Sequence, residues 1–218
     1  MNNESAPWAI QYVTRIDKAN PPSLEHYCLA HAEATVRLLE HSSQDPLLDA
    51  AFAEYEKGHI RKFARRANPN TFEKLSRLDL PHQDAHIGLA LTRVYAPAPT
   101  DVLAKEIHRL QLTGLTLPSP TGAAPTQQAK DAPKVTIAVN PKWGLDDHPG
   151  KLAAQVAHAA HIAYRKNAPL GAAPQPSFLL LWPTQAEFDL LKESAPVVIR
   201  DAGFTVLPQP GVTTIAFW

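Results

Sequence analysis

The chain has 218 residues, which is enough for one large domain or two small ones. Its 21 basic and 21 acidic residues give a formal net charge of zero, which excludes a chain-wide electrostatic grip on nucleic acid and leaves only a local patch as a polyanion site. The single cysteine, Cys28, excludes intrachain disulfides and cysteine-only metal clusters, and the lack of a signal peptide or a membrane-spanning apolar run predicts a cytoplasmic protein without membrane contact.

The first half of the chain predicts alternating strands and helices. Residues 9–16 are a predicted strand, and Ser23 is a predicted N-cap for a helix over 24–40. Periodicity and turn residues then predict helices at 46–57, 68–78 and 99–112, and strands at 60–67 and 89–95. This order is typical of an α/β unit.

A stretch rich in Pro, Ala, Gly and Thr divides the chain. Residues 114–134 have neither strand nor helix periodicity, which predicts a linker between 1–113 and 135–218. The run 178–182 is entirely apolar, so we expect a central strand covered on both faces. The other elements expected in the second half are strands at 135–140, 197–199 and 212–217 and helices at 150–165 and 184–193.

Three short motifs occur in the same order in both halves. They are L-A-H-A-E-A around His31 and V-A-H-A-A-H around His158, 68–75 and 183–191, and Q-D-A-H at 83–86 and R-D-A-G at 200–203. Repeated motifs in one order indicate a duplication. We therefore predict an α/β fold of two tandem similar three-layer units, each a small mixed sheet with helices on both faces.

The helix at 150–165 and the segment after 199 bring together groups that can support hydrolysis. Lys151, Gln155 and His158 are spaced i, i+4 and i+7, so they share one face of the helix. Asp201 and Thr205 lie at a strand end and glycine turn, where loops converge on one rim of a sheet. We predict that Lys151 and Asp201 form an ion pair, with Thr205 beside them at the mouth of a cleft.

The motifs G-K-L-A-A-Q-V-A-H-A at 150–159, D-A-G-F-T at 201–205 and G-V-T-T at 211–214 resemble those of the archaeal and eukaryotic-type peptidyl-tRNA hydrolases. The resemblance covers essentially all of 135–218. It implies a compact sheet with helices on both faces, usually assembled as a dimer, that hydrolyses the ester between a peptide and the 3′ end of tRNA. It also implies catalytic and supporting residues and no metal or organic cofactor; the residues are Lys151, Asp201 and Thr205, supported by Gln155, His158 and Thr214.

The chain departs from the family pattern in several places. Phe204 and Val206 replace the usual arginine and glutamine around Thr205, and the loop 207–211 is rich in proline. The family's extra helix is reduced to 167–176, and its closing helix is missing. These departures affect tRNA contact and turnover more than the fold.

The first half keeps the architecture but not the chemistry. Aligned on the two histidine motifs, Leu24 and Cys28 replace the lysine and glutamine of the second half, and Asp84 has no threonine after it. We interpret 1–113 as a degenerate copy that serves as an internal dimer partner. Its dense basic stretch predicts either a charged strand edge or a phosphate-contact surface for tRNA, formed by Lys57, Arg61, Lys62, Arg65 and Arg66.

Three functions remain open from the sequence. The chain is a peptidyl-tRNA hydrolase with its site in the second half, a catalytically inactive relative that binds tRNA or another RNA, or a protein-interaction module on the same scaffold. The first function is favoured because the second half retains together all five polar residues of the motifs, Lys151, Gln155, His158, Asp201 and Thr205. The altered residues around Thr205 and the zero net charge favour the other two.

Overall fold

The computed structural model describes residues 6–118, 134–167, 176–203 and 205–218. The linker residues 119–133, most of the reduced helix at 167–176, and Phe204 lie outside the described residues. The first unit contains β1 (Trp8–Arg15), α1 (Leu24–Ser42), α2 (Pro46–Glu56), β2 (Lys62–Ala67), α3 (Pro69–Leu75), β3 (His82–Ile87), β4 (Ala90–Pro99), η1 (Thr100–Val102) and α4 (Lys105–His108). The second contains β5 (Lys134–Val139), η2 (Pro141–Trp143), η3 (Leu145–Asp147), α5 (Pro149–Asn167), β6 (Ser177–Leu181), α6 (Gln185–Ser194), β7 (Val197–Asp201) and β8 (Gly211–Phe217).

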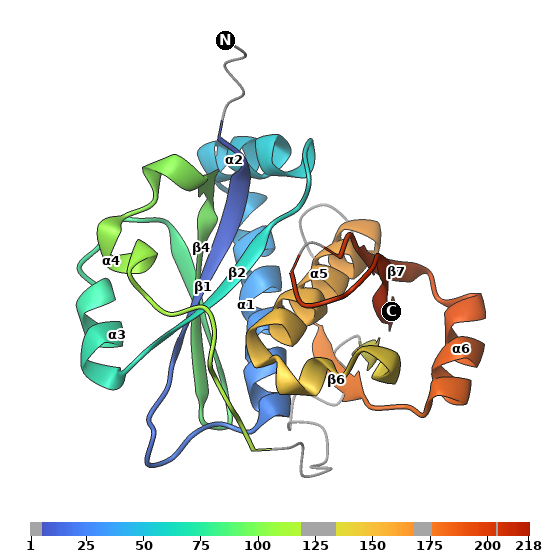
Figure 1. Cartoon of the computed structure of the whole chain (residues 1–218). Helices are drawn as coiled ribbons and strands as arrows, with labels where there is room; N and C mark the ends of the chain where they lie inside the picture. The colour runs from blue at the N-terminus through green and yellow to red at the C-terminus, as the bar shows by residue number, and fades with distance from the viewer. Residues whose placement is uncertain (1–5, 119–133, 168–175, 204) are drawn as a thin grey trace.

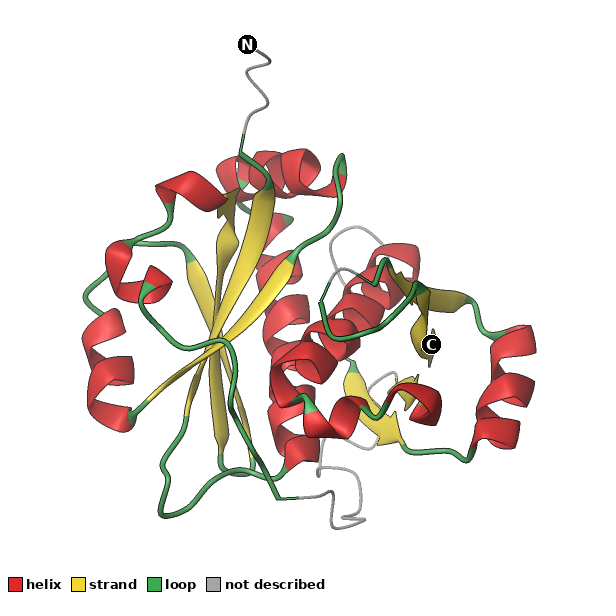
Figure 2. Ribbon diagram, in the orientation of Figure 1, coloured by secondary structure: helices red, strands yellow, loops and turns green. Residues whose placement is uncertain are grey.

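The two sheets have the same topology. Their strand orders are β2-β1-β4-β3 and β6-β5-β8-β7. Figure 2 draws the strands of both sheets in yellow and the helices around them in red. In each sheet the first strand of the unit pairs in parallel with the second and antiparallel with the fourth, and the fourth pairs antiparallel with the third. The predicted α/β fold of two similar units with mixed sheets is therefore confirmed.

Local sequence signals account for the helix starts. Ser23 Oγ accepts the backbone N–H of His26 at 3.2 Å, so the predicted N-cap of α1 is confirmed. Thr184 and Glu187 form a capping box at the start of α6, in which each side chain binds the other residue's backbone N–H. These bonds satisfy donors that the first turn of a helix otherwise leaves free.

Two of the predictions for single elements are wrong, and one strand, β3, is an element that the sequence does not predict. The run 178–182 forms an edge strand, β6, because it pairs only with β5. Its apolar composition has another cause: Phe178 and Leu180 face the central core, while Leu181 packs near Phe188 of α6. The predicted helix at 99–112 consists only of the short elements η1 and α4. Strand β3 has a polar sequence that gives no strand signal, and its ladder with β4 holds it in place.

The helices α1 and α5 pack against each other between the two sheets (Figure 1). One buried cluster includes Leu29 of α1, Val156 of α5 and Ile137 of β5, so the core is continuous across the two halves. Ala30 and Ala157, which are equivalent when the two histidine motifs are aligned, are both fully buried. Small side chains at equivalent positions allow the two helices to approach closely, as in an internal pseudo-dimer.

The helices were also compared with the length and apolarity that a bilayer requires. Across 6–118, 134–167, 176–203 and 205–218, none is both long and apolar enough to cross a membrane.

We predict that Ala157→Leu destabilises the protein. Ala157 belongs to a buried cluster with Ala34 and Leu38 of α1, so the three carbon atoms that leucine adds must displace their neighbours. Overpacking of this kind lowers the free energy of unfolding by about 1–3 kcal/mol. Urea denaturation measures the change. Ala186→Leu, on the exposed side of α6, is the matched control and should stay within about 0.5 kcal/mol of wild type; equal values for both variants would contradict a shared core.

Candidate active site

An ion pair joins the start of α5 to the end of β7. Lys151 Nζ donates to Asp201 Oδ2, and the two side chains are 18% and 11% exposed. Lys151 lies in the first turn of α5, which contains no acidic residue, so the helix dipole and the free N–H groups add to its positive charge. The predicted contact between Lys151 and Asp201 is confirmed.

Three donors hold the Asp201 carboxylate in place. Besides Lys151, Gln155 Nε2 donates to Oδ2 at 3.0 Å, and the backbone N–H of Gly203 donates to Oδ1 at 2.9 Å. Gly203 has φ 78°, and a Cβ there would lie 2.7 Å from the backbone of Gln209. Only glycine fits this turn without strain, and the turn supplies the third hydrogen bond.

Gln155 connects the ion pair to β8. Its Oε1 accepts the hydroxyl of Thr213 at 2.7 Å, and its backbone carbonyl accepts the hydroxyl of Thr214 at 3.2 Å. Neighbouring residues of a strand normally point to opposite faces, yet both threonines reach α5. The register shift at Ile199/Arg200, opposite Thr213, explains this, because a bulge turns an extra residue toward the helix.

Thr213 is therefore a site residue that the sequence reasoning missed. The adjacent pair Thr213-Thr214 was the available signal, but strand alternation allowed only one of the two to face the helix. Thr214, which was predicted to support the site, binds only the backbone of Gln155.

Thr205 and His158 do not join the hydrogen-bonded network. The side chain of Thr205 is exposed, and no residue that the structure describes is hydrogen-bonded to it. His158 is half-buried, and its Nε2 has no hydrogen-bond partner among the described groups. Burial, followed by the nearby positive charges of Lys62 and Lys151, lowers the pKa of His158 well below the ordinary histidine value. This histidine is neutral and packed at physiological pH.

The predicted basic surface is not one surface, because two of its residues are buried. Lys62 and Arg65 are only 8% and 6% exposed. Arg65 donates to the Gln11 side chain at 2.9 Å and to two backbone carbonyls near α4. These two residues hold the fold together, so the prediction that they contact phosphate is wrong. Of the others, Lys57 and Arg61 are exposed, and Arg66 donates to Gln111 Oε1.

Lys62 lies in a buried polar cluster between the two units. Its Nζ is 3.1 Å from the Tyr55 hydroxyl and 3.2 Å from His161 Nδ1. His161 Nε2 is 2.8 Å from Glu56 Oε1, which also accepts Arg165 Nε at 2.9 Å. Because a carboxylate can only accept, the contact with Glu56 assigns the proton of neutral His161 to Nε2. Nδ1 then accepts a hydrogen bond from Lys62 Nζ. Burial lowers the pKa of Lys62 to about 7 and that of His161 to about 4.

The first unit does not reproduce the site. Leu24 and Cys28, at the positions of the lysine and glutamine, are buried in the core. Arg93 binds both carboxylate oxygens of Asp84 at 2.8 Å. Asp201 pairs with Gly211, the first residue of β8, whereas Asp84 pairs with Arg93, three residues into β4. In the first unit, the residue that pairs with the first residue of β4 is Ile87, so Ile87 and not Asp84 is the structural equivalent of Asp201. The sequence alignment of the two aspartates is therefore wrong by three positions.

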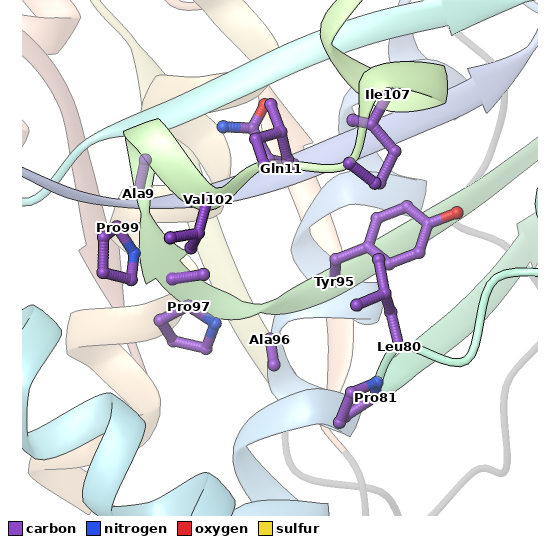
Figure 3. Close-up of a pocket in the computed structure, with 13 residues that line it drawn as sticks. Ala9, Gln11, Leu80, Pro81, Tyr95, Ala96, Pro97, Pro99, Val102 and Ile107 are labelled. Carbon is purple, nitrogen blue, oxygen red and sulfur yellow. The ribbon is translucent and has the colours of Figure 1, made fainter.

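Two cavities lie in the first unit, away from the ion pair. One of about 200 Å³ is apolar and is lined by Tyr95, Pro97, Pro99 and Ile107 (Figure 3). The other, of about 320 Å³, lies beside Tyr55. Neither cavity includes a residue of the Lys151–Asp201 network.

Possible metal ligands were considered across the whole described structure. Within the part of the chain that it describes, no group of three or more His, Cys, Asp or Glu side chains is placed to hold a metal ion.

Comparison with known proteins gives no match. No family model matches the chain, and no curated protein or solved structure is significantly similar to it.

The Lys62 cluster predicts a pH dependence of stability. The pKa of Lys62 falls from 10.5 in the unfolded chain to about 7 in the folded protein. Between these two pH values the unfolded state binds more protons than the folded state. The contribution of Lys62 to the free energy of unfolding therefore rises with pH across that window. Lys62→Met removes this contribution. Urea denaturation at pH 7 and pH 9 should therefore show a smaller rise for Lys62→Met than for wild type, while Lys57→Met, which alters an exposed lysine, should match wild type. An unchanged rise in Lys62→Met would contradict burial of the charge.

Proposed function

We propose that the chain hydrolyses the ester bond between a peptide, or an N-blocked amino acid, and the 3′ end of tRNA, at the site formed by Lys151 and Asp201. The observation that carries the proposal is the ion pair at the start of α5, which is extended through Gln155 to Thr213. The residues of this network belong to the motifs that resemble the archaeal and eukaryotic-type peptidyl-tRNA hydrolases. The proposed setting is the cytoplasm, and the proposed partner is peptidyl-tRNA.

The network contains the groups that ester hydrolysis needs. Water adds to the ester carbonyl, and the bond between the carbonyl carbon and the ribose 3′ oxygen breaks. The proton that water gives up passes to the leaving 3′ oxygen, so the products are a carboxylic acid, which ionises to a carboxylate, and the 3′ hydroxyl of tRNA. Lys151 and the N–H groups at the start of α5 stabilise the negative charge that develops on the carbonyl oxygen. Asp201 orients Lys151 and accepts a proton from the attacking water. The proposal requires no metal or organic cofactor.

Gln155 and Thr213 act as positioning residues in this proposal. Gln155 Nε2 donates to the same Asp201 oxygen as Lys151, and Thr213 fixes the orientation of the Gln155 amide. The first unit would act as the built-in dimer partner, because its helix α1 packs against α5.

We expect Lys151→Ala and Asp201→Asn each to lower hydrolysis of N-acetyl-aminoacyl-tRNA by about 100-fold or more, the usual scale for losing an electrostatic or acid–base group. The single-turnover rate with purified protein measures this. Asp84→Asn is the matched control, because Asp84 is also an aspartate at an ion pair on the third strand of its unit, but outside the network. Its rate should stay within about threefold of wild type.

A near-native rate in Lys151→Ala and Asp201→Asn would exclude catalysis by this pair. An equal loss in Asp84→Asn would show that the assay reports folding or that the first unit contributes a site. Thermal unfolding of each variant separates these two outcomes.

We also expect Thr213→Val to lower the hydrolysis rate more than Thr205→Val. Thr213 is buried and holds Gln155, whereas Thr205 is exposed and its hydroxyl is replaceable by solvent. The expected losses are about tenfold for Thr213→Val and about threefold or less for Thr205→Val. Both substitutions are isosteric, so the comparison isolates the hydroxyl; the reverse order would give Thr205 the main role.

One observation favours a second candidate function, an RNA-binding relative without catalysis. The threonine that the motif assigns to the chemistry lies outside the hydrogen-bonded network. A wild-type protein that binds tRNA but releases no amino acid from it would establish this second function.

A further inference from the structure

The segment that contains Trp143 is fixed to the same strand as the candidate site. Trp143 Nε1 donates to the backbone carbonyl of Val212 at 2.7 Å, and Asn140 Nδ2 donates to the same carbonyl at 2.8 Å. The backbone N–H of Asn140 donates to the carbonyl of Thr213 at 2.9 Å. The loop between β5 and α5 is thus anchored at the two residues of β8 that adjoin the Gln155–Asp201 network.

The indole ring lies directly on the backbone at the site. A Cβ at Gly211 would be only 2.2 Å from Trp143 Cζ2, so glycine is required here for the ring to pack on the strand. Gly211 is the ladder partner of Asp201. The ring therefore packs on the residue that is paired with Asp201, whose carboxylate binds Lys151.

A positive charge accompanies the ring. Lys142 is exposed, and its Nζ lies 5.0 Å from the centroid of the Trp143 ring. Trp143 is only partly buried, and it packs against the central core. Lys142 Nζ lies over the ring, so its flexible side chain must swing off this face for a base to stack there. An aromatic ring held by its N–H, with a lysine that can move from the ring to a phosphate, is a combination that binds unpaired nucleotides.

We infer that Trp143 and Lys142 form a stacking platform for an unpaired nucleobase at the 3′ end of the tRNA substrate. The inference rests on the proposed function, since it assigns part of the substrate to the same site. Trp143 stacks on the base, Lys142 contacts a neighbouring phosphate, and the ester is thereby directed to Lys151 and Asp201. Stacking tolerates any base, so the platform itself provides little sequence preference.

The test is binding of a short, fluorescently labelled single-stranded RNA ending in CCA, measured by anisotropy with the full chain. Trp143→Leu keeps an apolar side chain but removes the aromatic ring and should weaken binding by about tenfold or more, whereas Trp143→Phe should stay within about threefold of wild type. Trp182→Ala, at an exposed tryptophan beyond β6, is the matched control and should bind as wild type does. Lys142→Ala should reduce the slope of log Kd against log salt by about one phosphate contact.

Equal binding by Trp143→Leu and wild type would overturn the inference, as would an equal loss in Trp182→Ala or no RNA binding by wild type. Thermal unfolding confirms that the compared variants are folded, and the Phe and Leu variants preserve most of the packing.

The outcome of the RNA-binding test can be separated from the outcome of the hydrolysis test. If wild type binds the RNA through Trp143 but releases no amino acid from tRNA, the platform stands and the proposed hydrolysis fails. If hydrolysis occurs and Trp143→Leu changes neither KM nor RNA binding, the hydrolysis stands and the platform fails.

Discussion

The packing of α1 against α5 is the constraint on which the rest of the structure depends. Both helices are rich in alanine and lie between the two sheets, so each contributes to a core that neither half completes alone. Other parts of the first unit, β2 and the segment after α4, pack against the start of α5. A Cβ at Gly150 would lie 3.3 Å from the carbonyl oxygen of Leu112 and 3.5 Å from that of Ala64, so the first unit determines where Lys151 is placed. The half without the Lys151–Asp201 pair thus contributes to the placement of that pair in the other half.

Much of this arrangement follows from local sequence signals. The cap at Ser23, the helix that begins near Gly150 and the glycine turn at Gly203 depend on signals within a few residues, and the structure has them where the sequence predicts. The Lys151–Asp201 contact is long-range, and it could be predicted only because both residues lie at element ends on the same rim.

The errors share a physical cause, which is pairing that local patterns do not encode. Lys62 and Arg65 look like surface charges, yet β2 is covered on both sides and their charges are satisfied inside. The position of Asp84 depends on ladder register, which a four-residue motif does not specify. The role of Thr213 depends on a bulge, which turns its side chain toward α5 although strand alternation predicts that it points away from the helix. In each case tertiary pairing, not propensity, decides where a side chain points.

The candidate site combines a helix N-terminus, a strand end and a bulge on one rim of the second sheet. Strand β8 connects its parts: Thr213 holds Gln155, Val212 holds Trp143, and Gly211 lies between the indole and Asp201. In the proposed function, this strand would carry both the hydrolytic groups and the aromatic platform for a substrate with a reactive ester beside an unpaired base. The equivalent strand of the first unit, β4, has Arg93 bound to Asp84 and lacks this arrangement.

The most direct test of the central claim is release of the N-acetyl amino acid from N-acetyl-aminoacyl-tRNA by the purified wild-type protein, with and without EDTA. The account predicts release well above the spontaneous rate, and equally with EDTA, because a lysine, an aspartate and a helix N-terminus carry the chemistry. Release no faster than in buffer would contradict hydrolysis at this site, and loss of release on addition of EDTA would contradict the role given to Lys151 and Asp201.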